Sequence, residues 1–162
     1  MMTLREFSIN DAPTILGWIK DKTAFRKWSA DRYSNYPATP DDMAAQYTAD
    51  NIYPLTADDE NVKVIGHIMI RIPDPLTPST VRLGFVIVDN ALRGKRYGQE
   101  LICKTIEYAK QQLGATKFTL GVFQNNPSAF HCYEAAGFKT TEKKENLIDG
   151  EIWECVEMAR ED

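Results

Sequence analysis

The sequence of 162 residues has little cysteine, little histidine and no long run of apolar residues. Its three cysteines, Cys103, Cys132 and Cys155, are widely spaced and odd in number, so we expect neither a disulfide framework nor a Cys-x-x-Cys metal site. The two histidines, His67 and His131, are too few for a histidine-rich zinc site. We therefore expect free thiols and no bound metal.

Long hydrophobic segments and excess positive charge are also missing. No stretch approaches the roughly 20 apolar residues of a membrane-spanning helix, and the first residues, MMTLREFSINDA, lack the apolar core of a signal peptide. The net charge of −4 argues against broad binding of nucleic acid, which needs a basic surface to neutralise phosphates. These absences predict a cytoplasmic protein that binds neither membranes nor nucleic acid.

The composition that is present fits one globular domain. Hydrophobic residues make up 43% of the chain and charged residues 26%, as in folded soluble proteins. A chain of this length can bury one core but is short for two domains. We predict a single domain over residues 1–162.

Periodicity and turn residues predict that strands and helices alternate along the chain. Strands are expected at 3–9, 52–57, 62–72, 81–88 and 118–122, and in the two arms of a hairpin around Asp149-Gly150. Helices are expected at about 11–19, 39–50, 97–113 and 126–136, and the aromatic segment 25–37 is expected to be a loop. This order is that of one mixed α/β domain.

The segment LRGKRYGQE combines two glycines with three cations, after an apolar strand and before an expected helix. A helix N-terminus offers unpaired N–H groups, and Gly94 and Gly98 would let a ligand approach the backbone. Arg93, Lys95 and Arg96 add charge that suits a phosphate. The alternative is a solvated strand-to-helix loop, and the residues of this segment alone leave both interpretations open.

From Val81 onward the sequence resembles the GCN5-related N-acetyltransferase (GNAT) superfamily. Its signature Gln/Arg-x-x-Gly-x-Gly/Ala lies at a strand-to-helix turn that holds the pyrophosphate of acetyl-CoA. Here Arg93 takes the first position and Gly98 the last, and Arg96 stands where the family has its internal glycine. A second segment, VFQNNPSAFHCYEAAGF, resembles the signature V-x-x-x-N-x-x-A-x-x-x-Y-x-x-x-G-F. Its matching residues are Val122, Asn126, Ala129, Tyr133, Gly137 and Phe138.

The resemblance implies an α/β (α+β) fold. It consists of a central, mixed, mostly antiparallel twisted sheet of about seven strands, flanked by four helices and splayed between the fourth and fifth strands. It also implies transfer of an acetyl group from acetyl-CoA to a primary amine by direct attack in a ternary complex. The residues it implies for binding acetyl-CoA are Phe85, Val86, Ile87, Val88, Arg93, Gly94, Lys95, Arg96, Tyr97, Gly98, Asn126, Ala129 and Tyr133.

Two of these residues also have plain structural interpretations. Asn126 before Pro127 is a good helix cap, and Tyr133 can be a half-buried packing aromatic. The resemblance implies that Asn126 helps to orient coenzyme A and that Tyr133 is the general acid. Phenol and thiol have reference pKa values of about 10 and 8.5, so a tyrosine can reprotonate a departing thiolate.

The general base is harder to assign. Many relatives carry a glutamate early in the central strand, where this sequence has Arg82, and arginine cannot act as a base at neutral pH. We take His67 as the candidate base because imidazole titrates in the right range, although a lone strand histidine is more typical of a structural role. Asp89, Glu134 and a relayed water are the other candidates.

The acceptor is expected under the amino-terminal helices, by the same resemblance. This part of the chain is rich in aromatics, and we take Trp28, Tyr33 and Tyr36 as candidate substrate-binding residues. Packing is the alternative role for them. Small molecules, aminoglycoside-like compounds and peptide N-termini all stay open as acceptors, and the chain is expected to be a monomer or a homodimer. The alternative function is a non-catalytic acyl-CoA sensor or interaction module.

Overall fold

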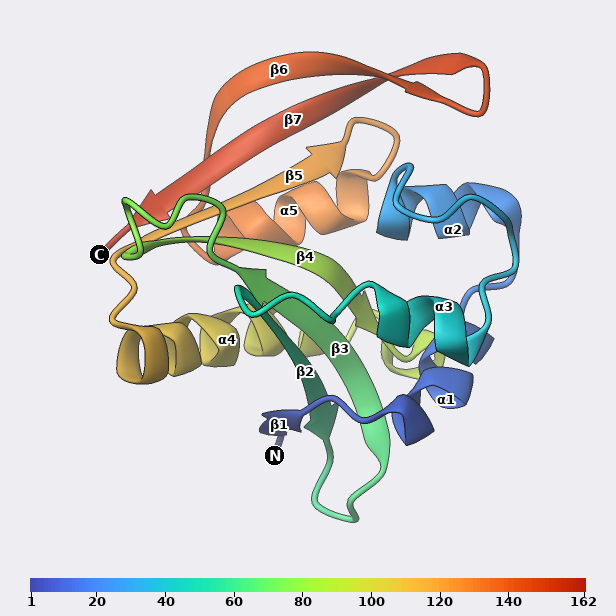
Figure 1. Ribbon diagram of the computed structural model, residues 1–162, viewed down its shortest axis with the longest axis horizontal. Helices are drawn as coiled ribbons and strands as arrows, with labels where there is room; N and C mark the ends of the chain where they lie inside the picture. The colour runs from blue at the N-terminus through green and yellow to red at the C-terminus, as the bar shows by residue number, and fades with distance from the viewer.

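The computed structural model describes residues 1–162 and combines seven strands with five α-helices (Figure 1). The strands are β1 (Thr3–Glu6), β2 (Ile52–Asp58), β3 (Val64–Arg71), β4 (Thr80–Val88), β5 (Lys117–Phe123), β6 (Lys139–Ile148) and β7 (Glu151–Glu161). The α-helices are α1 (Ala12–Gly17), α2 (Lys22–Ser29), α3 (Pro40–Ala45), α4 (Tyr97–Leu113) and α5 (Pro127–Ala135). Short 3-10 turns, η1 (Ile9–Asp11) and η2 (Asn90–Leu92), precede α1 and follow β4.

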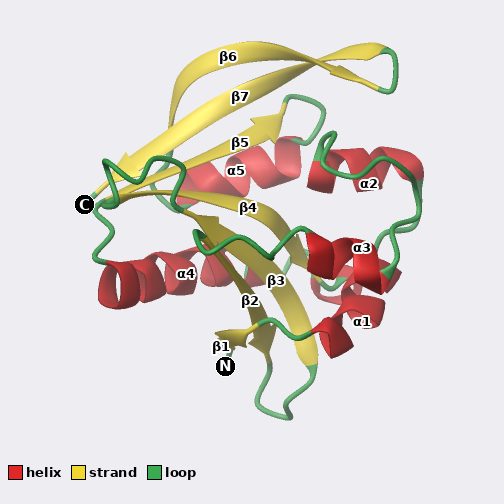
Figure 2. Ribbon diagram, viewed as in Figure 1, coloured by secondary structure: helices red, strands yellow, loops and turns green.

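The strands form one mixed sheet in the order β1-β2-β3-β4-β5-β7-β6. All neighbours are antiparallel except β4 and β5, which are parallel and pair only through Thr80–Arg82 and Lys117–Thr119. Beyond these residues the two strands diverge (Figure 2). The predicted seven-stranded, mostly antiparallel sheet with a splay between its fourth and fifth strands is confirmed.

A bulge in β4 accompanies this divergence. The register between β3 and β4 shifts between His67 and Met69, and opposite this shift Phe85 has a φ of 52°. A bulge adds a residue to one strand, bends it and increases its twist. The bend turns the carboxyl half of β4 away from β5.

The main core lies between the sheet and the helices α4 and α5. The apolar positions of α4 recur at helical spacing, so Leu101, Ile102, Ile106 and Ala109 all point into this core. Phe118, Leu120 and Val122 alternate along β5 and face the same side; they belong to the same cluster. The other face of the sheet is therefore left for the amino-terminal helices.

On that second face, the structure corrects the expected loop at 25–37. Its first residues belong to α2, an additional helix that makes five α-helices where four were expected. The Asp21 side chain accepts a hydrogen bond from the Ala24 N–H, and Phe25 and Ser29 are buried one turn apart. The many aromatic residues of this segment obscured the helical spacing of this short amphipathic helix. The helix expected to fade near Asp50 ends earlier, at Ala45.

The hairpin predicted around Asp149-Gly150 is confirmed. Both turn residues have positive φ, 49° and 85°, as a tight two-residue hairpin turn requires. The tip is attached to α2, because Arg26 donates from Nε to Asp149 Oδ2 at 2.9 Å. The β6–β7 hairpin and α2 thus contact each other across the open end of the splay.

No helix in this fold has the length and apolar character needed to span a membrane.

Candidate functional site

The turn between β4 and α4 presents an open helix N-terminus. Arg93, Gly94, Lys95 and Arg96 are all exposed, and Gly94 has a φ of 80° with nothing near its missing side chain. Arg96 is the N-cap of α4, in left-handed conformation with φ 65° and ψ 14°, and its side chain makes no capping hydrogen bond. The first N–H groups of α4 are therefore available to an anion, at the positive end of a 17-residue helix.

Gly98 was expected to leave space for a ligand, but in the structure it lies against α5. A Cβ built on it would lie 3.3 Å from Cys132 Sγ on α5. The small residue therefore allows α4 and α5 to approach closely, rather than leaving space at the turn. This contact also joins the two sequence signatures, since Gly98 belongs to the first and Cys132 lies within the second.

The carboxyl half of β4 has one buried and three half-exposed residues. Phe85 is buried in the aromatic cluster of the second face, whereas Val86, Ile87 and Val88 are partly exposed. Because β5 no longer pairs with β4 here, backbone groups on this side of β4 have no strand partner. The divergence creates a place where an extended ligand can pair with the β4 backbone.

The helix α5 holds the second set of expected residues. The Asn126 side chain accepts a weak hydrogen bond from the Ala129 N–H at 3.4 Å, so Asn126 caps α5. Tyr133 lies one turn beyond Ala129, only 7% exposed, with its ring centroid 6.4 Å from that of Phe138. Burial raises the pKa of the Tyr133 hydroxyl above its usual value, with a smaller contribution from Cys132. The phenol therefore stays protonated throughout the physiological pH range.

His67 is fully buried on β3, where it is the register partner of Ile87. Its Nε2 lies 2.7 Å from the Tyr47 hydroxyl, and its ring packs against that of Phe7 with centroids 5.3 Å apart. Burial lowers the pKa of the imidazole to about 3. The ring is thus neutral and enclosed, which favours the structural role over proton exchange with a substrate.

The expected substrate-binding aromatics pack around Phe85. Trp28 and Tyr33 stack with an interplanar angle of 14° and a centroid distance of 5.8 Å, and Trp28 lies 5.2 Å from the Phe85 ring. Tyr36 contacts the cluster through Phe25, at 5.1 Å. The Trp28 Nε1 and the Tyr33 hydroxyl are buried without a hydrogen-bond partner. These aromatic residues thus pack over the β4 bulge at Phe85, and two of them carry a buried polar atom without a hydrogen bond.

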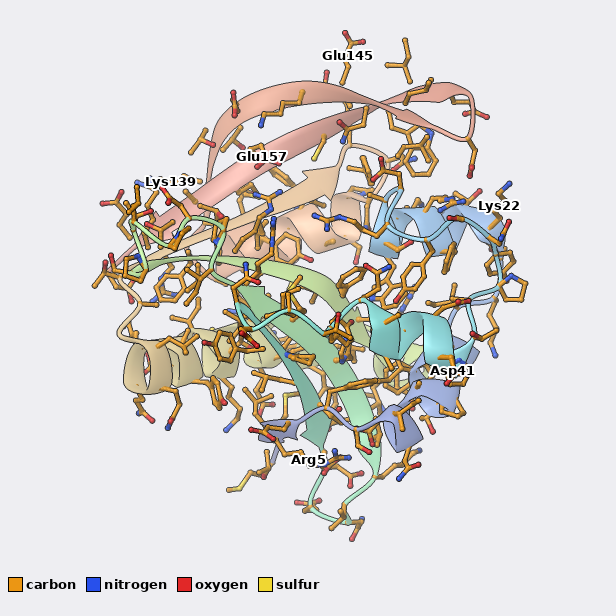
Figure 3. The ribbon with its side chains drawn as sticks, in the orientation of Figure 1. Arg5, Lys22, Asp41, Lys139, Glu145 and Glu157 are labelled. Atoms are coloured by element: carbon orange, nitrogen blue, oxygen red, sulfur yellow. The ribbon has the colours of Figure 1, made fainter.

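A charged cluster that the sequence did not predict lies where β4 and β5 begin to diverge. Arg82 donates two hydrogen bonds to the Glu157 carboxylate, at 2.8 and 3.1 Å, and Cys155 Sγ lies 3.6 Å from it. Figure 3 shows Glu157 on β7. Gly121 makes room for this cluster, because a Cβ there would lie 2.7 Å from Glu157 Oε2. Burial raises the pKa of Glu157, but the bonds and charge of Arg82 outweigh it and hold the pKa below its usual value.

This cluster joins residues far apart in sequence, so spacing could not reveal it. Glu157 follows Arg82 by 75 positions and lies on a strand two places away in the sheet. The only signal in the sequence was one charged residue between two apolar residues on each strand, since Arg82 and Glu157 both lie between residues of the main core.

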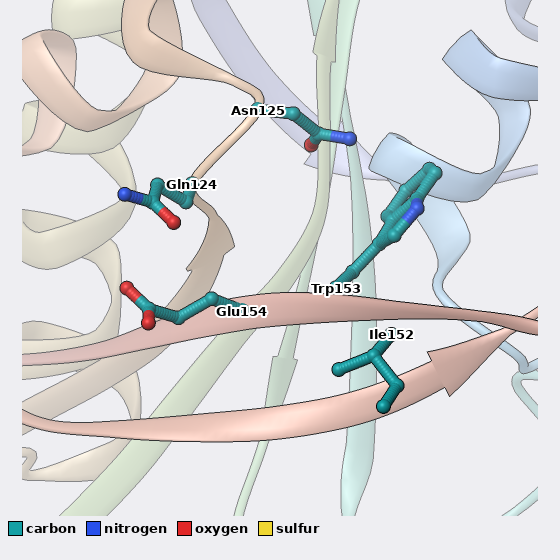
Figure 4. Close-up of a pocket in the computed structure, with 5 residues that line it drawn as sticks. All are labelled: Gln124, Asn125, Ile152, Trp153 and Glu154. Carbon is teal, nitrogen blue, oxygen red and sulfur yellow. The ribbon is translucent and has the colours of Figure 1, made fainter.

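A pocket of about 370 Å³ opens between the end of β5 and the start of β7 (Figure 4). Its lining residues are Gln124, Asn125, Ile152, Trp153 and Glu154. Figure 4 shows Asn125 and Trp153 extending toward the amino-terminal helices. The pocket therefore lies at the mouth of the splay, beside the hairpin that contacts α2.

No group of three or more histidine, cysteine, aspartate or glutamate side chains is arranged to hold a metal ion.

Comparison with known proteins gives a consistent result. Residues 22–138 match the model of the Acetyltransferase (GNAT) family. A comparison by sequence with curated proteins finds no match. Many solved structures match the fold.

Two of the similar structures span nearly the whole chain. The spermidine N-acetyltransferase from Vibrio cholerae, solved with CoA and spermine, is 20% identical, with a TM-score of 0.82 over 99% of this chain and 95% of that one. A structure provisionally assigned as a phosphinothricin N-acetyltransferase is 23% identical, with a TM-score of 0.79 over 99% of this chain and 98% of that one.

Proposed function

Since the chain belongs to the acetyltransferase (GNAT) family, we propose that it transfers an acetyl group from acetyl-CoA to a primary amine, by direct attack in a ternary complex. The observation that carries this proposal is the conjunction of the uncapped N-terminus of α4 with the splay between β4 and β5. Among the similar structures, the spermidine enzyme is described in complex with CoA and an amine.

The pyrophosphate is proposed to bind at the turn 93–98. Backbone N–H groups at the start of α4 donate to it, and Arg93, Lys95 and Arg96 supply positive charge from exposed positions. Arg96 does not block this seat, because its backbone already adopts the left-handed conformation that a glycine would take. The family's internal glycine is thus replaced here at the cost of some backbone strain.

The pantetheine arm is proposed to occupy the divergence between β4 and β5. There it pairs with the β4 backbone along Phe85–Val88, with Asn126 and Ala129 beside it on α5. Acetyl-CoA supplies the activated acetyl group, and N–H groups of β4 near the bulge polarise its carbonyl. Holding both substrates in one site turns a bimolecular encounter into a local one.

Tyr133 is proposed to donate a proton to the departing thiolate. Transfer from a phenol whose pKa is raised by burial would be uphill to a thiolate in water. Burial acts on both groups, however, because an enclosed thiolate is destabilised in the same way as an enclosed phenolate. A protonated, buried hydroxyl is therefore suited to this step.

Solvent is proposed to take the proton of the acceptor ammonium. Glu134 is exposed and pairs with His131, and Asp89 accepts a hydrogen bond from the Ala91 N–H in its own turn. His67 is enclosed by aromatic rings. These three candidates are thus engaged elsewhere, which leaves a relayed water.

Two measurements test the proposal. Calorimetric titration with acetyl-CoA should give saturable binding, and release of free thiol should follow when a suitable amine is added. If millimolar acetyl-CoA gives no saturable heat, the protein does not bind acetyl-CoA and the proposal is refuted. Binding without thiol release across a broad amine panel would instead favour a non-catalytic acyl-CoA sensor, a role that the replacement of the strand glutamate by Arg82 also fits.

A further inference from the structure

Two arginines face each other on neighbouring strands, on the side of the sheet that carries the aromatic cluster. Arg71 of β3 and Arg82 of β4 are register partners, so their side chains leave the same face. Met69, two residues before Arg71, belongs to the aromatic cluster and fixes which face this is. Like charges in directly opposite positions destabilise a sheet unless something offsets them.

The protein offsets only one of these charges. Glu157 binds Arg82 through both of its carboxylate oxygens. Arg71 Nε is buried and has no hydrogen-bond partner. Burial, followed by the charges of Arg32 and Arg82, lowers the pKa of Arg71, and no carboxylate acts in the opposite direction. Three positive charges, those of Arg32, Arg71 and Arg82, thus act on one another, and of Arg71 and Arg82 only Arg82 is bonded to a carboxylate.

This arginine cluster, made of Arg32, Arg71, Arg82 and Glu157, is separate from the proposed pyrophosphate seat. Arg82 precedes Val88 by six residues, which is about 20 Å along an extended strand. The bulge at Phe85 is much nearer, about 10 Å from Arg82 by the same measure. The cluster therefore lies near the proposed position of the acetyl group and far from the phosphates.

The cluster is also open to a ligand. The Arg82 side chain is 29% exposed, and its guanidinium lies over the exposed Gly121, where an added Cβ would be 2.9 Å from Arg82 Nη2. A small molecule can thus reach the guanidinium group of Arg82 from the acceptor side of the sheet.

We propose that this cluster binds an anionic group on the acceptor, so that the amine acetylated by this protein carries a carboxylate or a similar small anion, as amino acids do. The proposal rests on the proposed acetyltransferase function and narrows its substrate class. An anion completes the hydrogen bonding of Arg71 and offsets the excess charge. A polyamine carries only positive charge, and this surface repels it.

The test uses matched pairs of acceptors. Thiol release from acetyl-CoA is measured with an α-amino acid, with the amine that results from removing its carboxyl group, and with spermidine. We expect kcat/KM to be about tenfold or more higher for the amino acid. Arg71→Gln should raise KM for the amino acid by a similar factor, while leaving kcat and the kinetics with the decarboxylated amine nearly unchanged.

Two further variants make this result specific. Arg71→Lys keeps the charge but loses the planar fork, so it should retain part of the preference even if Arg71→Gln folds poorly. Lys104→Gln removes a positive charge from α4, on the opposite side of the sheet, and should leave the preference intact. Circular dichroism verifies that each variant is folded.

Opposite outcomes overturn the proposal. A preference for spermidine or the decarboxylated amine would do so while leaving the acetyltransferase function standing, as would an unchanged KM in both Arg71 variants. If no amine is acetylated, calorimetry with the N-acetylated amino acid and coenzyme A decides the matter. Binding that is lost in Arg71→Gln supports the subsite, and absence of binding to the parent protein refutes it.

Discussion

At the scale of single residues, Arg96 shows how a departure from a family pattern can be tolerated. The turn before α4 requires a left-handed residue, and Arg96 adopts φ 65° with its side chain exposed. A residue with a Cβ pays about 1 kcal/mol or more for this conformation relative to glycine. Its charge, close to the proposed pyrophosphate, gives a functional reason for keeping an arginine there.

Arg96→Gly should therefore separate strain from charge. We expect the free energy of unfolding to rise by about 1 kcal/mol, which moves Tm by about 2–4 °C in a domain of this size. Affinity for acetyl-CoA should fall, because one phosphate-facing cation is lost. Thermal unfolding and calorimetric titration measure the two effects, and Arg96→Asn, which tolerates the same backbone better than most residues, is the matched control. An Arg96→Gly variant that is less stable would contradict the backbone strain, and one that binds acetyl-CoA more tightly would contradict the role of the charge.

Tyr133 offers a second prediction at this scale. Tyr133→Phe keeps the buried ring against Phe138 and removes only the hydroxyl. We expect kcat to fall by about tenfold to a thousandfold, in the range typical of positioned proton donors, with little change in acetyl-CoA affinity. Steady-state kinetics with calorimetry test this, and a variant with unchanged kcat would leave Tyr133 a packing residue only.

At the scale of elements, the close approach of α4 and α5 depends on one missing side chain. A Cβ on Gly98 would lie 3.3 Å from Cys132 Sγ, which is tighter than ordinary van der Waals contact. Both sequence signatures thus meet at a packing contact between two helices. Gly98 is explained by this contact more directly than by space for a phosphate.

Gly98→Val should consequently destabilise the protein by about 1–3 kcal/mol through overpacking. Cys132→Ala in the same chain should recover part of this loss, because it removes the atom that the new side chain meets. Urea denaturation of the two single variants and the double variant gives the coupling energy, expected at about 0.5–3 kcal/mol. Strictly additive effects would show that Gly98 and Cys132 do not act through this contact.

At the scale of the whole molecule, ion pairs connect distant segments and set the response to acid. Arg5 bridges Asp11 and Asp58, which joins β1, η1 and β2. Burial raises the pKa of Asp11, but hydrogen bonds from Arg5, from the Ser8 N–H and from Thr56 outweigh it and leave the pKa lowered. Hydrogen bonds from Arg160 and Lys110 lower the pKa of Asp162 to about 2.

A lowered carboxyl pKa stabilises the folded state only while the group is ionised. This contribution is complete above the unfolded pKa of about 4, and it is lost as the pH falls through the folded values. We expect the free energy of unfolding to decrease steadily between about pH 5 and pH 2. Urea denaturation at successive pH values measures it, and Asp11→Asn should flatten the dependence. Stability that rises or stays level over this range would refute the assignment.

Local sequence determined most of the elements and both signatures. The Thr39-Pro40 cap, the Asp149-Gly150 turn and the alternating or helical spacing of apolar residues are short-range features, and the structure confirms each of them. The helix α2 was missed because its eight residues carry too few turns to establish a period among so many aromatics.

Only the tertiary structure decided which side chains meet. The bulge at Phe85 and the three-residue pairing of β4 with β5 arise from contacts between strands, and they make the splay. The enclosure of His67, the contact of Gly98 with Cys132 and the gathering of Arg71, Arg82 and Glu157 join positions far apart along the chain. Sequence spacing carries local periodicity, whereas burial and charge pairing depend on neighbours that only folding supplies.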